Sequence, residues 1–448
     1  MDNRHDLTQG DVWKKLFSFF VPIALSGIIH QLYNTVDALI VAKYCGTESF
    51  AAISGSVTQV LNLMVGSFIA LTGGASVYIA QLYGIKDREK IRRAVCTSMW
   101  FCALLGIFVS VLGCIFTRSI LVYLKTPADT LEEAVLYMQI CFMAAFAVML
   151  YNMGAGIIRA AGDSRRPFIY ICACCVTNII LDYVLVKVFS MGVFGAAVAT
   201  AFSQLISFVL VLIQMFTTKE DYRLNPSPGN LSWRAIKATV KYGFPTAIQQ
   251  VVYGVTNTTI QVALNGLGTS IVAAWALTGK VDGIYWALMN AGGVAVMNFV
   301  GQNYGAGKLD RVKEASKRGL RNFMLVTVAL CAVLILTGRW LFPLFLADDP
   351  EVCDLAYRIM LVFVIPYFLW TVIEIVGGVL RGCGDVIVPA VISLIGVAGV
   401  RLLWVKTVFP AHPDVFVLGL VYPVSWLVTA AALLIRHRTG GWKKRREL

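Results

Sequence analysis

Twelve long apolar runs, separated by short polar segments, constrain the fold of this sequence more than any other feature. A helix needs about 20 apolar residues to cross the hydrocarbon core of a bilayer. In that core every backbone polar group must be hydrogen-bonded internally, which a helix achieves by itself. We therefore expect an all-α membrane protein with twelve transmembrane helices. The runs lie near residues 16–42, 51–80, 94–117, 134–158, 168–190, 193–217, 241–265, 271–300, 321–345, 356–380, 386–410 and 415–435.

The composition excludes most classes of soluble protein. Apolar and aromatic residues make up 58% of the 448 positions and charged residues 14%, whereas an average soluble domain has about 45–50% and about 25%. The net charge of +13 does not indicate a nucleic-acid partner, because so apolar a chain has little water-exposed surface for a basic patch. The eleven cysteines stand in apolar surroundings without paired spacing, so we expect neither disulfides nor a zinc site.

Lysine and arginine are concentrated in alternate connections between the runs. Most of the 38 basic residues precede the first run, occupy every second connection, or lie in the C-terminal tail. Basic loops favour the cytoplasmic side of a membrane. Because the number of runs is even, we expect both termini in the cytoplasm and a multi-pass protein of the plasma (inner) membrane.

The chain contains an internal repeat with a spacing of about 222 residues. The segment 156–163 (GIIRAAGD) recurs as 378–385 (GVLRGCGD), and Pro22 and Pro245 open equivalent runs. Two six-helix halves in the same orientation follow, which is a plan of secondary transporters. We expect an N-terminal lobe over 1–217, a cytoplasmic linker over 218–240, and a C-terminal lobe with a basic tail over 241–448.

Ionisable side chains inside the runs are candidates for function, because a charge at the centre of a membrane helix costs at least about 2.5 kcal/mol. Asn178 and Asp182 are four residues apart and share a helical face, while Asp37 lies inside the first run. If these helices touch, the two carboxylates can share a proton or hold Na⁺. The alternative is that they only form hydrogen bonds between helices. At the repeat spacing Asp182 corresponds to Trp404, so the acidic group belongs to one half.

The other polar side chains in the runs leave two interpretations open. Lys280 and Asp282 can form salt links or contact a substrate, and Glu374 can titrate or take part in hydrogen-bonded packing. We expect Arg401 to bind a carbonyl or carboxylate in its own half, and His30 to be a satisfied core histidine. The candidates for substrate binding or secondary coupling are Tyr33, Gln249, Lys280, Asp282 and Glu374.

No catalytic or nucleotide-binding motif occurs in the sequence. The segment Gly305-Ala-Gly307-Lys308 continues with Leu309, so it is not a phosphate-binding loop. A nucleophile elbow and a paired-histidine metal helix are also missing from the sequence. We therefore expect a protein that is not an enzyme and has no cofactor, and whose transport is either driven by an ion gradient, with H⁺ or Na⁺ as the coupling ion, or downhill.

Three segments resemble motifs of the multidrug and toxic compound extrusion (MATE) family: 156–167 followed by Asn178 to Asp182, 301–308 followed by Arg311, and 381–385. The resemblance extends over essentially the whole chain. It implies two six-helix lobes, alternating access, and export of cationic, amphipathic compounds in exchange for H⁺ or Na⁺.

The resemblance also implies which residues form the coupling site. The chain is similar to the branch of the family whose site lies in the N-terminal lobe, and the run after Pro245 lacks the glutamate that another branch uses. Pro22 would be the hinge of the first helix, because proline removes a helical hydrogen bond. The implied ion-coupling residues are Asp37, Asn178, Asp182, Thr200 and Asn152, of which Asp37, Asn178, Asp182 and Thr200 would hold Na⁺ if that is the ion.

A flippase for lipid-linked precursors, from the related superfamily, is the alternative function. Such a protein would need a basic cavity for an anionic carrier, whereas the acidic residues inside the runs favour cations. An intramembrane enzyme would need a reactive residue beside a polar cavity. The partners we expect are small cationic or amphipathic molecules and the lipid bilayer, with no nucleic acid and no obligate protein partner.

Overall fold

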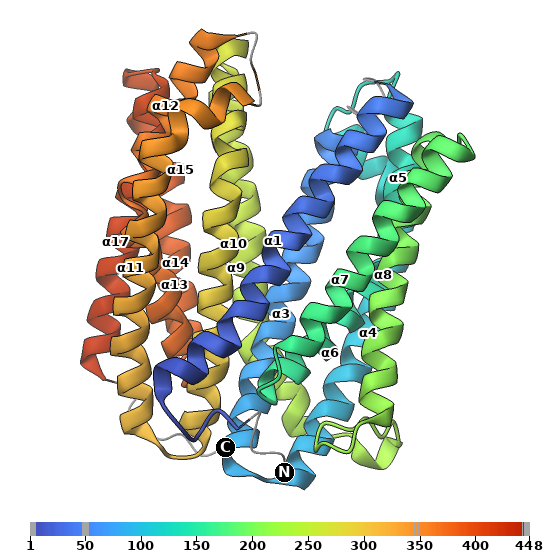
Figure 1. Ribbon diagram of the computed structural model, residues 1–448, viewed down its shortest axis with the longest axis vertical. Coiled ribbons are helices and arrows are strands. Elements are labelled where there is room, and N and C mark those ends of the chain that lie inside the picture. Colours follow the sequence, from blue (N-terminus) through green and yellow to red (C-terminus); the bar gives the residue numbers. More distant parts are fainter. Residues whose placement is uncertain (1–5, 47–52, 345, 347–348, 441, 443–448) are drawn as a thin grey trace. The chain divides into compact units, whose positions relative to one another are not determined.

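The computed structural model of the protein describes residues 6–46, 53–344, 346, 349–440 and 442. Within these residues every regular element is a helix (Figure 1). This confirms the all-α fold class that the apolar runs predict. A helical backbone satisfies its own hydrogen bonds, which is what the interior of a bilayer requires.

The described residues form two compact units, which we call the N-lobe and the C-lobe. The N-lobe comprises Ser18–Ala247 and the described residues before Thr8, and the C-lobe comprises Thr8–Phe17 and the chain from Ile248 onward. Two helices are therefore divided between the units: α1 (Val12–Cys45) and α9 (Trp233–Asn265). The segment 218–240 belongs to the N-lobe.

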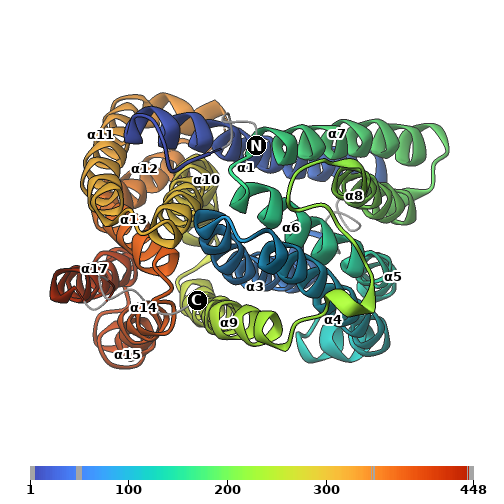
Figure 2. The same ribbon diagram turned by 90° about the horizontal axis from the view of Figure 1, so that it is seen from below.

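Within the N-lobe, α3 packs on α6 and α7 packs on α8; Figure 2 shows this lobe from below. A π-helical segment precedes α3 (Ile53–Val57) and another follows α7 (Tyr183–Val188). The helices are α3 (Thr58–Ile85), α4 (Arg88–Tyr123), α5 (Leu131–Met143), α6 (Ala145–Ala160), α7 (Arg165–Asp182) and α8 (Gly192–Thr217).

Within the C-lobe, α10 packs against α13, which also contacts α11 and α17. A third π-helical segment, Leu394–Gly399, joins α14 to α15. The helices are α10 (Thr269–Gly305), α11 (Leu309–Leu341), α12 (Pro350–Val364), α13 (Tyr367–Gly382), α14 (Ile387–Ser393), α15 (Val400–Thr407), α16 (Val415–Gly419) and α17 (Val421–Thr439).

Nine helical segments of the described chain are long and apolar enough to cross a membrane, and two bent pairs raise the number to eleven. The pairs are α5 with α6 and α12 with α13, each bent by 44°. Pro366 lies at the second break, where its ring and missing N–H interrupt the helix. The remaining predicted run lies in α9, whose 33 residues include the polar Gln249, Gln250 and Asn257. Up to eleven of the twelve predicted runs are thus candidate spans in the described chain, and the twelfth lies in a helix that is less apolar.

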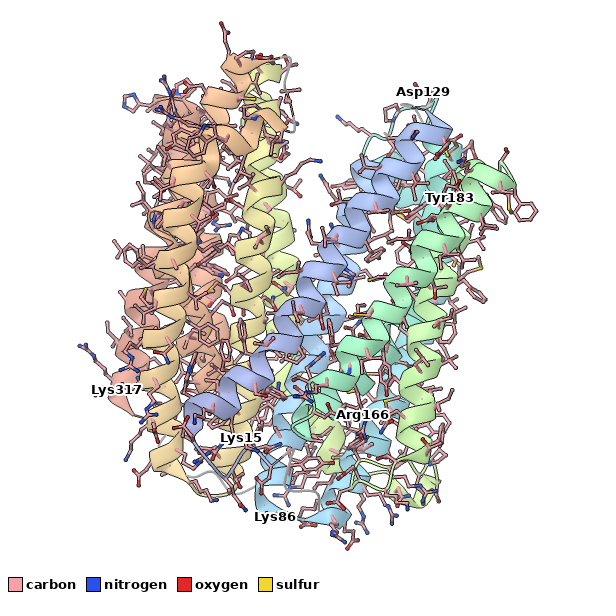
Figure 3. All side chains as sticks on the ribbon, viewed as in Figure 1. Lys15, Lys86, Asp129, Arg166, Tyr183 and Lys317 are labelled. Atoms are coloured by element: carbon pink, nitrogen blue, oxygen red, sulfur yellow. The ribbon has the colours of Figure 1, made fainter. Side chains whose placement is uncertain are left out.

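Figure 3 labels two basic residues at one end of each lobe. In the N-lobe, Lys86 and Arg166 lie at one end, and Asp129 and Tyr183 lie at the other. In the C-lobe, Lys15 and Lys317 both lie at a single end. This arrangement fits the alternation of basic and neutral connections in the sequence.

The repeated Gly-Asp motif ends equivalent helices of the two lobes. Gly162 follows α6 with φ of +95°, and Gly384 follows α13 with φ of +81°. In both lobes the backbone N–H of the next aspartate donates to a carbonyl near the end of the helix, at 3.1 Å for Asp163 and 2.9 Å for Asp385. Glycine takes this left-handed conformation without strain, which makes it the usual residue after a helix. The repeat is therefore visible in the backbone.

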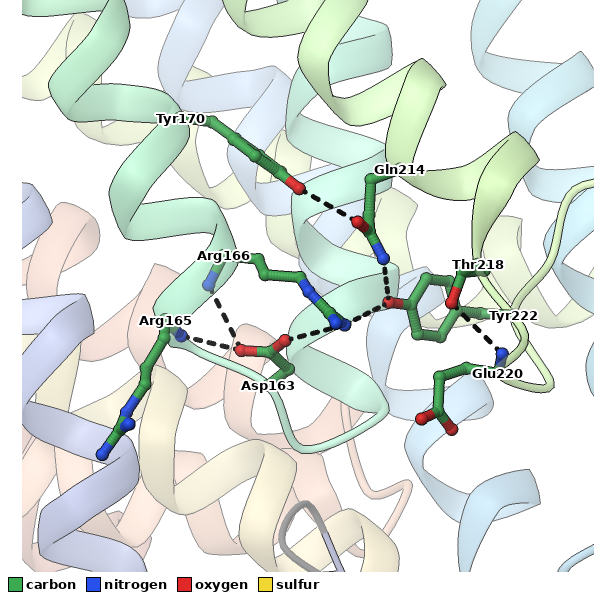
Figure 4. A network of polar contacts seen from close by, with 8 residues as sticks. All are labelled: Asp163, Arg165, Arg166, Tyr170, Gln214, Thr218, Glu220 and Tyr222. Atoms are coloured by element: carbon green, nitrogen blue, oxygen red, sulfur yellow. Dashed lines mark hydrogen bonds and ion pairs between the residues drawn. The ribbon is translucent and has the colours of Figure 1, made fainter. Parts of the chain in front are cut away.

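The two aspartates of this motif have different side-chain partners. Asp163 Oδ1 accepts from the backbone N–H groups of Arg165 at 2.9 Å and Arg166 at 3.2 Å, so it holds the start of α7 (Figure 4). Asp163 Oδ2 also pairs with the side chain of Arg166 at 3.2 Å. Asp385 Oδ2 forms an ion pair with Arg436 of α17 at 2.7 Å. Both aspartates are buried and both fix a helix end, so the motif has a structural role in each lobe.

A pair of glycines allows α3 and α9 to cross closely within the N-lobe. A Cβ atom on Gly74 would overlap the backbone of Gly243. Beside this crossing, Thr246 Oγ1 donates to the carbonyl of Ala70 at 3.0 Å. The first part of α9 is thus held against α3 by contacts between backbones, and a larger residue has no room there.

We expect Gly74→Ala to lower the free energy of unfolding by about 1–3 kcal/mol, the usual cost of overpacking a well-packed site. The measurement is thermal or denaturant unfolding of the purified protein in detergent. Gly73→Ala is the matched control, because a Cβ atom at Gly73 meets nothing within 4 Å. Equal unfolding temperatures for the two variants would contradict the close crossing.

Candidate functional site

Two carboxylates from different helices face each other inside the N-lobe. Asp37 lies on α1 and Asp182 is the last residue of α7, and their side chains are in contact. Asp182 is fully buried, as is Asn178 one turn earlier. The backbone passes into a π-helix directly after Asp182, and widened turns of this kind are frequent at functional sites.

Six buried polar atoms at this site have no hydrogen-bond partner among the described residues. They are Asp37 Oδ1, both carboxylate oxygens of Asp182, Oδ1 and Nδ2 of Asn178, and Thr200 Oγ1. Leaving a buried polar group unpaired costs about 1–3 kcal/mol. Two ionised carboxylates offer acceptors only, so neither can satisfy the other. A proton shared between them, or a cation bound by both, supplies the missing partner.

Tyrosine and cysteine side chains surround the carboxylates. Tyr33 is buried with 7% of its surface exposed and lies near Asp37. The ring of His30 meets that of Tyr33 edge-on, with centroids 4.9 Å apart. From α5, the buried Tyr137 lies beside Thr200. Side chains of α1, α5, α7 and α8 thus build the site.

The donor set suits a proton or a hard monovalent cation. In the part of the chain that the structure describes, no group of three or more His, Cys, Asp or Glu side chains is arranged to hold a metal ion. Two carboxylates with an amide and a hydroxyl nearby are the oxygen ligands that hard cations prefer. The same carboxylates bind a single proton equally well by sharing it.

Asn152 and Pro22 each take part in a hydrogen bond within their own helix. The Nδ2 of Asn152 donates to the carbonyl of Val148 at 2.8 Å. Pro22 lies inside α1, which runs through it without a break. The hydroxyl of Ser26 donates to the Pro22 carbonyl at 2.8 Å.

The polar residues of the C-lobe interior are mostly paired with one another. Glu374 forms an ion pair with Arg381 of the same helix at 3.5 Å. The Nε2 of Gln249 donates to the hydroxyl of Tyr253 at 2.9 Å.

Arg401 shows the same pattern of pairing within the C-lobe. Its guanidinium donates to Asn257 Oδ1 at 3.2 Å and to Ser425 Oγ at 3.3 Å. It also lies over the ring of Tyr422, 4.1 Å from the centroid. Arg401 therefore binds a side-chain amide oxygen, a hydroxyl and an aromatic ring of its own half, as the sequence partly predicts.

Asp282 has a carboxylate oxygen that is unpaired within the described chain, unlike the paired side chains of Glu374 and Arg401. It is buried, with 7% exposed, its Oδ1 has no hydrogen-bond partner among the described residues, and its carboxyl faces Tyr367. The stacked rings of Tyr285 and Tyr367 have centroids 3.8 Å apart. Lys280, two residues earlier, is exposed, so these two residues do not share an environment.

Sequence reasoning missed a polar network in the N-lobe (Figure 4). The hydroxyl of Tyr222 accepts from Arg166 Nη1 and from Gln214 Nε2, both at 3.0 Å. Gln214 Oε1 in turn accepts from Tyr170 at 3.5 Å. Tyr222 lies between helices in the chain, yet only 1% of its surface is exposed. An aromatic residue in a polar segment is the signal that marks such a contact.

A family model described as MatE matches residues 22–184 and 245–404. The probable multidrug resistance protein YoeA of Bacillus subtilis (strain 168) is 26% identical over 443 residues, covering 97% of this chain and 95% of that protein. The probable multidrug resistance protein NorM of Thermotoga maritima is 23% identical over 448 residues, covering 97% and 94%.

Two solved structures are similar to this fold over 99% of each chain, with TM-scores of 0.88 and identities of 20%. One is the outward-facing conformation of a multidrug resistance MATE family transporter. The other is a MOP superfamily transporter from Pyrococcus furiosus Vc1 (DSM3638) whose title reports a binding pocket of reverse polarity. At this identity the likeness concerns the fold. The family model, in contrast, covers well over half of the sequence with one segment for each half of the repeat, and the chain therefore belongs to the MatE family of membrane transporters, which are not enzymes.

Proposed function

We propose that this protein is a secondary active multidrug exporter, which expels cationic, amphipathic compounds in exchange for H⁺ or Na⁺ by alternating access. The observation that carries the proposal is the contact between Asp37 and Asp182, whose buried oxygens have no partner among the described residues. The relatives named as multidrug resistance proteins support the substrate class.

The carboxylate pair gives a physical basis for coupling. An ion drives a conformational change only if it binds the two states with different affinity. Asp37 is on α1 and Asp182 is on α7, so any movement of α1 along α7 changes the distance between their charges. The ion binds tightly where the carboxylates meet and weakly where they separate. Asn178 and Thr200 add oxygen atoms for Na⁺ at the same place.

The polarity of the N-lobe site favours a cationic substrate. Two carboxylates lie together inside the lobe, and no arginine or lysine forms an ion pair with either among the described residues. An anionic lipid carrier would be repelled there, which argues against the flippase alternative. Within the C-lobe, Asp282 is the residue that best fits a second contact with a cation, whereas Glu374 and Gln249 already have partners.

The proposal includes a position in the cell. Both termini lie in the cytoplasm and the protein spans the plasma membrane, because lysine and arginine are concentrated before the first run, in every second connection and in the C-terminal tail, and basic loops are retained on that side. The two repeats, 1–217 and 241–448, are joined on that side by the linker 218–240. Transport requires no further protein and no cofactor besides the coupling ion.

Efflux of a fluorescent cationic dye from liposomes containing the purified protein tests the proposal. A pH gradient and a Na⁺ gradient are imposed separately, which identifies the ion. We expect Asp182→Asn to slow the driven efflux by about tenfold or more, the effect of losing roughly 1.4 kcal/mol of coupling. Asp354→Asn is the control, because that aspartate is exposed and pairs with Arg358 at the surface. Efflux that responds to neither gradient would contradict antiport.

The carboxylate pair also predicts how stability depends on ions. The wild-type protein should gain stability when the pH is lowered or when Na⁺ is added, because a ligand of the folded state stabilises it. Asp37→Asn supplies an N–H donor to Asp182 and removes a repulsive charge, so without Na⁺ at alkaline pH it should be more stable than the wild type by about 1–3 kcal/mol.

Thermal unfolding in detergent at pH 6 and pH 9, with and without Na⁺, measures both effects, and Asp354→Asn again serves as the control. A wild-type unfolding temperature that is insensitive to both ions would rule out an ion site at this pair.

A further inference from the structure

The first residues of α1 pack with the C-lobe, although the rest of this helix belongs to the N-lobe. We call the segment Thr8–Phe17 the N-terminal clasp. Leu16 is fully buried, and Val12 is 2% exposed. The ring of Trp13 meets that of Phe323 on α11 edge-on, with centroids 6.0 Å apart.

Three basic side chains of the C-lobe hold the backbone and side chains of the clasp. Lys308 Nζ donates to the carbonyl of Thr8 at 2.8 Å. Arg311 Nη1 donates to the carbonyl of Gly10 at 2.6 Å, while its Nε is held by Asn303 Oδ1 at 2.8 Å.

Arg318 completes the set of basic contacts. Its Nη1 pairs with Asp11 Oδ2 at 3.3 Å. The other oxygen of Asp11 accepts from the backbone N–H of Lys14 at 2.8 Å and so caps α1. The Lys14 N–H, aided by the positive charge of Arg318, lowers the pKa of Asp11. The pair is therefore present at neutral pH and is lost only as the pH falls through this lowered pKa.

The contacts of the clasp give a structural role to the motif at residues 301–308 and Arg311, which is not part of the ion site. Lys308 directly precedes α11 and Arg311 lies in the first turn of that helix, where the sequence resembles the family motif. Gly10 has φ of +81°, which lets the chain turn into α1 beside Arg311. The motif thus recognises the N-terminal segment of its own chain.

The helix that begins in the clasp also carries Asp37. It is continuous from Val12 to Cys45, and the 20 residues from Phe17 to Asp37 span about 30 Å. Pro22 has no N–H, so the carbonyl of Ser18 loses its helical partner. Ser18 is the first residue of α1 that packs with the N-lobe. The weakest point of the helix therefore lies where it passes from one unit to the other.

The second divided helix has the same arrangement. Pro245 lies inside α9, two residues before Ala247, the last residue of this helix that packs with the N-lobe. Gly243 and Thr246 fix the preceding part against α3. Both divided helices therefore carry a proline at the transition, as the internal repeat requires.

We propose that Arg311 and Arg318 are positioning residues for ion coupling: by holding the clasp on the C-lobe, they make a movement of that lobe and a bend of α1 at Pro22 a single event. A bend moves Asp37 relative to Asp182. Ion binding at these carboxylates therefore changes the conformational equilibrium of the C-lobe through α1. This inference rests on the proposed antiport, and it assigns the connection between the two processes to the clasp.

The test compares Arg311→Gln/Arg318→Gln with Lys313→Gln/Lys317→Gln, which removes the same charge from the same helix without touching the clasp. The full-length protein is reconstituted in liposomes, and ion flux and dye efflux are measured in the same preparation. We expect the clasp variant to move at least about fivefold more ions per dye molecule than the wild type, the lower range of typical coupling factors. The control variant should retain the wild-type ratio.

Hydrogen exchange of the clasp provides a readout that does not depend on transport. In the wild type, adding the coupling ion should change the exchange rate over residues 12–26, and Asp37→Asn should abolish that response. In the clasp variant the segment should exchange fast with and without the ion, while the ion-dependent shift in unfolding temperature remains. If the double variant does not fold, Asp11→Asn removes the pair with Arg318 and still leaves an oxygen to cap α1.

Two results would overturn the inference: an unchanged ratio of ions to dye in a variant whose clasp exchanges fast, or a clasp in the wild type that does not respond to the ion. Failure of the proposed antiport looks different. In that case the wild-type protein itself moves dye under neither gradient, and its unfolding temperature responds to neither ion.

Discussion

The structure depends on the cost of leaving a polar group unpaired where water is scarce. Helices meet this constraint for the backbone, which is why twelve apolar runs become helices. Side chains meet it with local pairs, such as Glu374 with Arg381 and Asp385 with Arg436. Against this background, buried atoms without a partner among the described residues are informative. Six of those in the N-lobe belong to Asp37, Asn178, Asp182 and Thr200, where an ion from outside the protein can complete the pairing.

The fold was largely predictable because apolar length and charged connections are properties of the sequence itself. The bend at Ala144 between α5 and α6 was not, since no proline or glycine marks it. Isolation in apolar runs marks Asp37 and Asp182 as candidates, and the helical spacing adds Asn178, but the sequence does not say that the helices of the two aspartates touch. The amide Nδ2 of Asn152 donates to a carbonyl of its own helix. That hydrogen bond depends on the side-chain rotamer, which a sequence pattern does not specify.

The two lobes share their architecture and differ in their chemistry. Gly162 and Gly384 end equivalent helices with the same backbone geometry, yet the aspartates that follow them bind different partners. The repeat thus preserves the positions where the backbone needs glycine, whereas side-chain partners have diverged. The position equivalent to Asp182 is Trp404, whose Nε1 donates to the carbonyl of Val417 at 3.0 Å. The ends of equivalent helices thus follow the repeat. The pair Asp37 and Asp182, in contrast, belongs to the N-lobe alone.

Continuity of the backbone links the ion site to the second lobe. The boundaries expected from the repeat, at 217 and 241, follow the order of helices in the chain, whereas packing divides α1 after Phe17 and α9 after Ala247. Sequence analysis does not find these divisions, because they depend on contacts over about 300 residues, such as Arg311 with Gly10. A helix held at one end by one unit and carrying a charge inside the other cannot change at either place independently. Pro22 lies between these two places and sets the point at which α1 bends. The carboxylates of Asp37 and Asp182 set which ion favours or opposes that bend.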